Sequence, residues 1–308
     1  MPGQFLIVVA VKLGLFAINY GTCADPDVAV EVARHAEACG LESVWSGEHI
    51  VLPDPRPPGL PFPPTLPLLD TAVALTLIAA HTRTLKIASG IIIAPLRNPV
   101  LLAKELASLD VVSAGRLIVG LGTGYIDAEF EAAGVPRAQR QARTDDCIEA
   151  LRALWTMARP SYRGSYAKFD GINAYPRPVQ RPAPPIVVGG EGPRAFTRAV
   201  TLADGWYGFG LDLDSTRGCL GQLRTISQAR ERPAHLGRLQ ITVTPVGPLD
   251  RAVIEQYIEL GVDRLVVLPQ PDRDSAGKHQ PVSRDQIMRN LDSLTETCAG
   301  LLDRAEGT

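Results

Sequence analysis

Short runs of apolar, β-branched residues alternate along the chain with longer segments in which apolar residues recur at helical spacing. Strands that are apolar throughout are typical of a parallel sheet covered on both faces, and their alternation with helices is typical of βα units. The pattern predicts eight strands, at residues 11–18, 43–46, 85–92, 117–121, 186–188, 205–209, 239–246 and 264–268.

Helices are expected between these strands, and several of their starting points carry an Asp or Ser N-cap or an early proline. The expected starts lie near Asp25, Asp70, Pro99, Arg143, Gly192-Pro193, Asp214, Asp250 and Ser283. Eight strands alternating with eight helices favour a closed (β/α)8 TIM barrel over an open doubly wound sheet, as one α/β domain over residues 1–308. Such barrels bind ligands at the carboxyl ends of their strands.

Two segments interrupt the alternation. The proline-rich residues 53–67 are predicted to form a long loop after strand two, either a surface linker or a substrate lid. Residues 162–185, rich in Tyr, Gly and Pro, predict an irregular or hairpin insertion before strand five. The apolar residues 5–16 read as a first buried strand, because no basic residue precedes them and Lys12 interrupts them.

Composition narrows the classes of partner. The 308 residues carry a net charge of −2 with no basic stripe, so neither nucleic acid nor a membrane surface is expected. No apolar run reaches the roughly 18 residues of a membrane span. Five cysteines without a CxxC pair and five scattered histidines argue against disulfides, a zinc site or any other metal. We therefore expect a cytoplasmic protein that acts on a small-molecule organic substrate.

The end of strand two carries an acid and an imidazole. Glu48 and His49 would lie at the rim of the barrel where ligands bind. A histidine there can hydrogen-bond a cofactor ring or a substrate and exchange protons near neutral pH. A structural histidine that bonds a backbone carbonyl is the alternative.

Strand three contains Ser89, Gly90 and Ile91 within an otherwise continuous apolar run. A glycine inside a buried strand marks a bulge or the close approach of another group. That group could be a flavin-like ring, and a bulge that serves only barrel packing is the alternative.

Two glycine-rich turns follow strands four and five. Gly122, Thr123, Gly124 and Tyr125 would let a ring or phosphate approach the backbone, although their spacing does not fit a dinucleotide fingerprint. After strand five, a glycine-rich turn leads into a helix. Its backbone amides and an arginine could form a cradle for phosphate, and an ordinary βα turn is the alternative. Its residues are Gly189, Gly190, Gly192 and Arg194, with Glu191 between them opposing an anion.

Taken together, these segments resemble a known family. The matching stretches are 45–49, 89–99, 107–125, 142–155, 176–185, 186–190 and 203–206. They resemble the luciferase-like monooxygenase superfamily and are most similar to its F420-dependent (deazaflavin) oxidoreductases of actinobacterial type. The resemblance implies a (β/α)8 barrel, usually a homodimer, that holds F420 or alternatively FMN.

The resemblance also implies a reaction and positions for the site residues. The expected reaction is hydride transfer between C5 of F420 and an organic substrate, with His49 or Tyr125 balancing the proton. Gly122 to Tyr125 would lie beside the ring, Gly189 to Arg194 around the phosphate, and a non-prolyl cis peptide at Gly90-Ile91 behind the ring.

The sequence departs from the family pattern at two positions, and two other functions remain as alternatives. Tyr125 stands where the sugar-phosphate dehydrogenases of the family have a glutamate proton donor, and Glu48 stands where an aspartate is common. Both departures argue against sugar-phosphate oxidation. An FMN-dependent monooxygenase and a non-catalytic F420- or flavin-binding protein are the alternatives.

Overall fold

All strand pairs of the large sheet are parallel, and its first and last strands are hydrogen-bonded neighbours. The computed structural model describes residues 11–270 and 282–301. Pairing of β3 with β5 closes the sheet into a barrel. Its strands are β1 (Lys12–Phe16), β2 (Ser43–Ser46), β3 (Lys86–Ser89), β4 (Ile92–Ile93), β5 (Leu117–Gly122), β8 (Ile186–Gly189), β9 (Gly205–Leu211), β10 (Gln240–Pro245) and β11 (Arg264–Val267).

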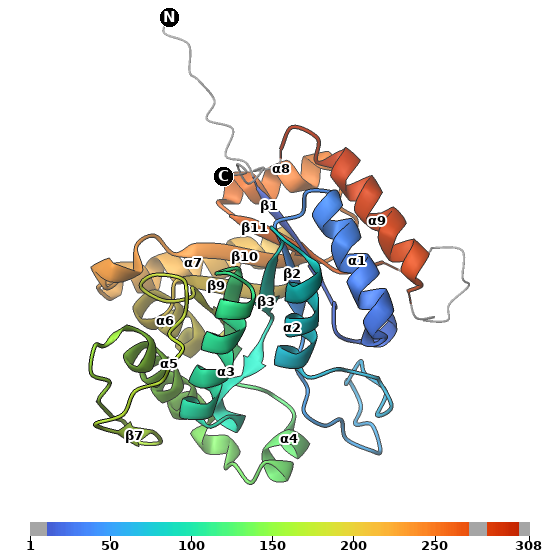
Figure 1. Cartoon of the computed structure of the whole chain (residues 1–308). Coiled ribbons are helices and arrows are strands. Elements are labelled where there is room, and N and C mark those ends of the chain that lie inside the picture. The colour runs from blue at the N-terminus through green and yellow to red at the C-terminus, as the bar shows by residue number, and fades with distance from the viewer. Residues whose placement is uncertain (1–10, 271–281, 302–308) are drawn as a thin grey trace, which may run out of the picture.

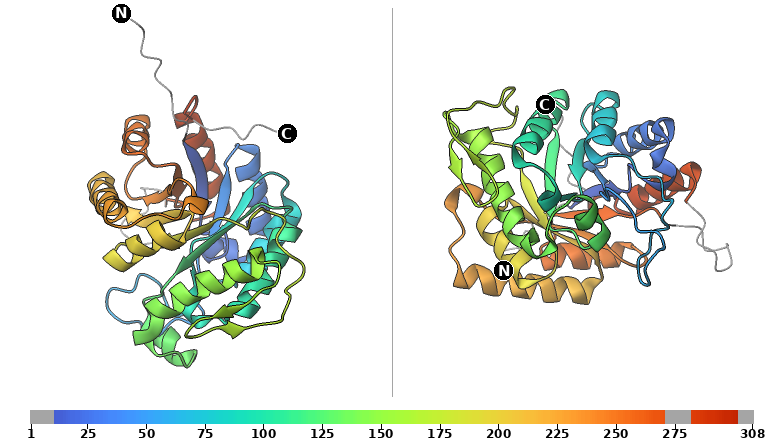
Figure 2. Two further views of the ribbon diagram at one scale, coloured as in Figure 1. Left: turned by 90° about the vertical axis from the view of Figure 1, so that its left-hand side faces the viewer. Right: turned by 90° about the horizontal axis from the view of Figure 1, so that it is seen from below.

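Helices surround these strands and connect them in order (Figures 1 and 2). They are α1 (Pro26–Ala38), α2 (Thr71–His81), α3 (Pro99–Val112), α5 (Arg140–Thr156), α6 (Pro193–Leu202), α7 (Leu213–Ala229), α8 (Arg251–Leu260) and α9 (Arg284–Thr297). The caps expected from the sequence form, since the side chains of Asp25, Asp70 and Ser283 accept amides of α1, α2 and α9. The predicted (β/α)8 barrel is confirmed.

The third barrel strand differs from the prediction because it is interrupted. It consists of β3 and β4, separated by a cis peptide bond between Gly90 and Ile91, the step that the resemblance implied. The helix expected near Arg143 begins at Arg140, and the short helix α4 (Asp127–Ala132) precedes it. The sequence did not predict α4, which has six residues and no side-chain cap at Ile126.

Both expected insertions are present. Residues 51–67 form no helix or strand and lie at the same end of the barrel as α4 (Figure 1). In the second insertion, β6 (Tyr162–Arg163) and β7 (Lys168–Phe169) pair as an antiparallel hairpin.

Residues 5–10 of the expected first strand lie outside the described residues. None of the helices in the described ranges has the length and apolar character needed to cross a bilayer.

The barrel has two apolar layers. One lies between the strands and the helices, and the other fills the barrel interior. The interior layer consists of Phe16, Trp45, Ala88, Ile118, Val187, Tyr207 and Val266. A Cβ on Gly90 would lie 2.9 Å from the Phe16 ring and 3.0 Å from the Trp45 ring, so the interior is filled up to the break in strand three.

A buried ion pair connects neighbouring elements of the barrel at the start of β11. Arg264 bonds both carboxylate oxygens of Glu42, each at 2.7 Å, and Lys86 adds a third bond at 3.0 Å. Burial alone would raise the pKa of Glu42, but the charge and hydrogen bonds of Arg264, together with Lys86 and Ser43, outweigh it and lower this pKa to about 2. The pair therefore links β11 to the residue before β2, across the intervening β1.

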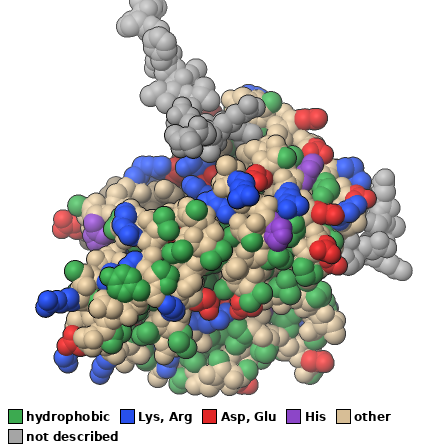
Figure 3. Space-filling model, viewed as in Figure 1, with side chains coloured by type: hydrophobic (Ala, Val, Ile, Leu, Met, Phe, Trp, Pro, Cys, Tyr) green, Lys and Arg blue, Asp and Glu red, His purple; other side chains and the backbone are tan. Residues whose placement is uncertain are grey.

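Helices α2 and α3 carry apolar side chains on their outer faces as well as on their inner ones. Val73 and Leu101 are 65% and 70% exposed, and Figure 3 shows apolar side chains gathered on the face that these helices present in Figure 1. Contiguous exposed apolar surface is typical of interaction sites.

Two glycines test the crowding inside the barrel. A Cβ on Gly120 would lie 1.9 Å from the carbonyl oxygen of Ser89, whereas one on Gly218, in α7, would meet nothing within 4 Å. We predict that Gly120→Ala lowers the free energy of unfolding by about 3 kcal/mol or more, because backbone must move. Gly218→Ala should raise it by about 0.5–1 kcal/mol. Urea titrations followed by circular dichroism measure both, and equal stability of the two variants would contradict the crowding.

Candidate active site

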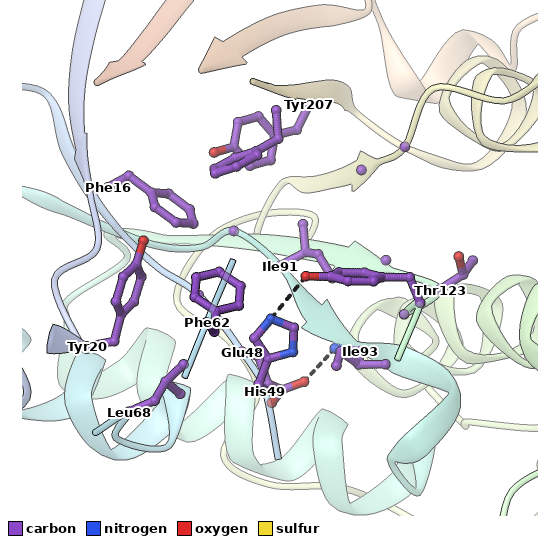
Figure 4. A pocket seen from close by; sticks show the side chains of 18 of the residues that line it. Phe16, Tyr20, Glu48, His49, Phe62, Leu68, Ile91, Ile93, Thr123 and Tyr207 are labelled. Atoms are coloured by element: carbon purple, nitrogen blue, oxygen red, sulfur yellow. Dashed lines mark hydrogen bonds between the residues drawn. The ribbon is translucent and has the colours of Figure 1, made fainter. Parts of the chain in front are cut away.

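A cavity of about 350 Å³ opens at the carboxyl ends of the strands (Figure 4). One wall is aromatic and is formed by Phe16, Tyr20, Phe62 and Phe209. Phe62 comes from the proline-rich loop, so that loop contributes to the cavity rather than serving only as a linker. A largely apolar cleft with a few converging polar groups is the usual form of a small-molecule site.

His49 lies between a carboxylate and a phenol at the edge of this cavity. Its Nδ1 lies 3.3 Å from Oε2 of Glu129. Its Nε2 lies 3.3 Å from the Tyr125 hydroxyl, a contact drawn as a dashed line at His49 in Figure 4. Glu129 is fully buried, and its Oε1 accepts a hydrogen bond from the Ile50 amide at 2.9 Å. A carboxylate beside Nδ1 favours the tautomer with the proton on Nδ1, which leaves the Nε2 lone pair facing the cavity.

Sequence reasoning found His49 and Tyr125 but missed Glu129. This residue lies in the first turn of α4, a helix too short to give a periodic signal. Its contact with His49 joins residues 80 apart in the chain. Tyr125 is 58% exposed. Its partial burial and the charge of Glu129 both raise the pKa of its hydroxyl.

Glu48, predicted to act in catalysis, lines the cavity, and its carboxylate is bonded to other protein groups. It is only 8% exposed, and its carboxylate accepts hydrogen bonds from the Ile93 amide and from Arg97, which also bonds Asp70 at 3.1 Å. Burial raises the pKa of Glu48, and the Arg97 charge and the Ile93 amide oppose that rise. With both oxygens occupied, Glu48 holds β4 and the following turn in place beside the cavity.

Ile91 and three glycines form another part of the cavity lining. The Ile91 side chain projects between the ends of β5 and β8, where a Cβ on Gly122 would lie 2.4 Å from its Cδ1 and one on Gly189 3.3 Å from its Cγ2. Gly124 has a φ of +70°, which favours glycine. Because glycine has no side chain, only the backbone and the Ile91 side chain would contact a ligand here. We name Ile91, Gly122, Gly124 and Gly189 the glycine floor.

Ser89 supports this floor from below. Its Oγ accepts from the Gly120 amide at 2.8 Å and donates to the Gly120 carbonyl at 2.9 Å. Ser89 is fully buried. The side chain therefore joins β3 to β5 beneath the floor, where strand three breaks, rather than reaching a ligand directly.

A second cavity, of about 510 Å³, adjoins the first at the beginning of α6 and shares Thr123, Gly189 and Gly190 with it. Gly192 caps α6 without a side-chain bond, and Pro193 follows as the first helical residue. Free amides at a helix start attract anions. Arg194 lines this cavity and is exposed, as is Glu191, whose charge opposes an anion.

Arg198, one turn further along α6, also lines the second cavity and was missed by sequence reasoning. It is 3% exposed, pairs with Asp145 and bonds Oε1 of Gln141 at 2.9 Å. A third cavity continues from there between α5 and α6 and is lined by Arg194, Arg198 and Arg230. Neighbouring cavities share lining residues, and the third is lined by the exposed Arg194 and Arg230 as well as the buried Arg198.

Comparison with known proteins identifies the family. The family model described as luciferase-like monooxygenase matches residues 5–282. The chain belongs to the luciferase-like monooxygenase family. The family is thus the one that the sequence segments resembled, and its members are oxidoreductases and monooxygenases.

Relatives and solved structures place this luciferase-like chain among proteins with two kinds of cofactor. Uncharacterized protein Rv0953c of Mycobacterium tuberculosis is 32% identical over 252 residues, which cover 79% of this chain and 87% of that protein. The FMNH(2)-dependent dimethylsulfone monooxygenase of Pseudomonas putida is 30% identical over 163 residues, or 52% of this chain and 45% of that one.

Among solved structures, an F420-dependent secondary alcohol dehydrogenase in complex with an F420-acetone adduct superposes with a TM-score of 0.75. It covers 96% of this chain and 100% of its own, at 17% identity. At that identity the likeness concerns the luciferase-like barrel alone.

The position of Glu48 leads to a stability prediction. Glu48→Gln keeps an oxygen for the Ile93 amide but removes the charge that Arg97 faces, so we expect the free energy of unfolding to fall by about 2 kcal/mol. Asp214→Asn, which removes an exposed partner of Arg217, should change it by less than about 0.5 kcal/mol. Urea titration compares them; if Glu48→Gln were as stable as the control, the carboxylate would not have the structural role assigned to it.

Proposed function

We propose that this luciferase-like protein is an F420-dependent oxidoreductase that transfers a hydride between C5 of the deazaflavin and a small organic substrate. The observation that carries the proposal is His49, held between Glu129 and Tyr125 at the edge of the glycine floor. A proton-exchanging group beside a flat apolar floor is what alcohol or carbonyl redox chemistry requires.

The residues present fit a flat ring system. The glycine floor leaves room where side chains on Gly122 and Gly189 would contact Ile91, so Ile91 and the floor backbone would support the ring. The amides at the start of α6, with Arg194, would hold its phosphate. When bound, the deazaflavin supplies a two-electron carrier, and the protein supplies orientation and electrostatics.

The polar residues would manage the proton. Glu129 fixes the Nδ1–H of His49, so Nε2 can accept a hydroxyl proton from an alcohol or return it to a carbonyl. Tyr125 approaches the same Nε2 and can donate to a substrate oxygen. Phe16, Phe62 and Phe209 line the same cavity and would exclude water from the reacting atoms.

The continuation of the cavity favours F420 over FMN. FMN ends at its phosphate, whereas F420 continues beyond its phosphodiester into a chain of glutamates. The third cavity extends beyond the start of α6 with Arg194, Arg198 and Arg230 against the single carboxylate of Asp145. An anionic tail would therefore find complementary charge there. FMN-dependent monooxygenation is the second candidate, favoured by the similarity to the dimethylsulfone monooxygenase.

Parallel titrations test the cofactor. Purified protein is titrated with F420, with FMN and with the deazaflavin lacking its phosphodiester tail, and ligand fluorescence is followed. We expect F420 to bind at micromolar or lower concentration and FMN at least about tenfold more weakly. The reverse order would support the FMN monooxygenase, and binding of neither would overturn both proposals.

An arginine variant makes this titration specific for the tail. Arg230→Ala should weaken F420 binding about two- to tenfold, as expected for a partly screened charge contact, and leave the tail-less deazaflavin unchanged. Arg224→Ala, on the exposed face of α7, is the matched control. An equal loss for both ligands would show that Arg230 does not face the tail.

Two variants test the proton-exchanging group once a substrate has been found. His49→Ala should lower turnover by about tenfold or more, and Glu129→Gln by a similar factor, because the amide no longer fixes the imidazole. Both should leave F420 affinity within about twofold of the native protein. Steady-state kinetics and the titration above provide the two readouts, and native turnover in His49→Ala would remove His49 from the mechanism.

A further inference from the structure

A second cluster of ligand-type side chains lies far from the cavity, where helices α1 and α9 pack against each other. His35 lies in the last turn of α1, Cys39 is its C-cap, and Asp292 projects from α9. His35 Nε2 lies 2.8 Å and Cys39 Sγ 3.5 Å from the same oxygen of Asp292, Oδ1. All three potential ligand atoms lie within 4.8 Å of one another.

The two separations that involve Asp292 are close to those between ligand atoms of a single metal ion. Zinc binds histidine nitrogen at about 2.0–2.1 Å, thiolate at about 2.3 Å and carboxylate oxygen at about 2.0–2.2 Å. Tetrahedral bonds of these lengths place neighbouring ligand atoms roughly 3.3–3.8 Å apart. The Cys39–Asp292 separation already falls in this range, and the His35–Asp292 separation needs a rotamer adjustment of about 0.5 Å.

The types of ligand atom and their exposure also fit zinc. One nitrogen, one sulfur and one oxygen form a borderline-soft set that zinc accepts. His35 and Cys39 are four residues apart, so both side chains emerge on one face of α1. The His35 and Asp292 side chains are 30% and 55% exposed, which gives an ion and a water ligand access from solvent. The thiol of Cys39 is directed at the same Asp292 oxygen as the imidazole of His35.

We propose that His35, Cys39 and Asp292 bind one zinc ion, with water as the fourth ligand, and that the ion links α1 to α9. These two helices belong to the first and last βα units of the barrel, whose strands β1 and β11 pair. Zinc bound there stabilises the folded chain, because the ligands from the two helices come together only on folding. The site is independent of the cofactor proposal.

Calorimetry on the full chain tests the site. Protein purified without a histidine tag is stripped of metal with a chelator, desalted and titrated with zinc chloride under reducing conditions. We expect one zinc per chain at micromolar or lower Kd, and a higher melting temperature with zinc than with chelator. Cys39→Ser and Asp292→Asn should each weaken binding by about tenfold or more.

His81→Ala is the matched control. His81 is exposed in the last turn of the neighbouring helix α2, as His35 is in α1, but His81 bonds the carbonyl of Leu77 instead. The His81→Ala variant should therefore bind zinc with the same affinity as the native protein. Cobalt gives a second readout, since a thiolate-to-cobalt charge-transfer band should appear with native protein and vanish in Cys39→Ser. Absence of binding, or binding that Cys39→Ser and Asp292→Asn leave unchanged, would overturn the proposal.

Discussion

The close approach of backbone to backbone at the break in strand three is the constraint on which the site depends. Gly120 has no room for a Cβ because the Ser89 carbonyl lies against it, and the Ser89 hydroxyl bonds both backbone polar groups of Gly120. This contact holds β3 against β5 just before the chain turns at Gly90. Ile91 is thereby carried between the ends of β5 and β8, where Gly122 leaves space for its side chain. A side chain on Gly120 would collide with the Ser89 backbone, and one on Gly122 would collide with the Ile91 side chain.

The polar residues around this floor have distinct tasks. Glu48 is occupied by Arg97 and the Ile93 amide and fixes the strand segment after the break. Glu129 orients His49, the group that faces the cavity. Two buried carboxylates within one site thus differ in their partners, since Glu48 bonds an arginine and a backbone amide, whereas Glu129 contacts His49 and the Ile50 amide. The start of α6 and its arginines give the cavity a cationic end.

Much of this arrangement could be predicted from the sequence, because it depends on local signals. The continuous apolar runs predicted the strands, Asp25, Asp70 and Ser283 predicted helix starts, and the Ser-Gly step predicted the irregularity in strand three. The remaining features of the site depend on contacts between residues that are far apart in the sequence. The contact of Glu129 with His49 spans 80 residues, and Asp292 lies 253 residues from Cys39. Nothing in the spacing of these residues along the chain indicates such contacts, so the sequence alone did not indicate Glu129 or the cluster of His35, Cys39 and Asp292.

The central claim is that the glycine floor holds a deazaflavin with its reactive edge toward His49. A crystal structure of the protein grown with F420 tests it most directly and requires no knowledge of the substrate. The ring is predicted to lie on Ile91 and the floor, with its phosphodiester at the start of α6 and C5 accessible from the His49 side. A ring bound elsewhere, or one whose C5 faces away from His49, would contradict the claim.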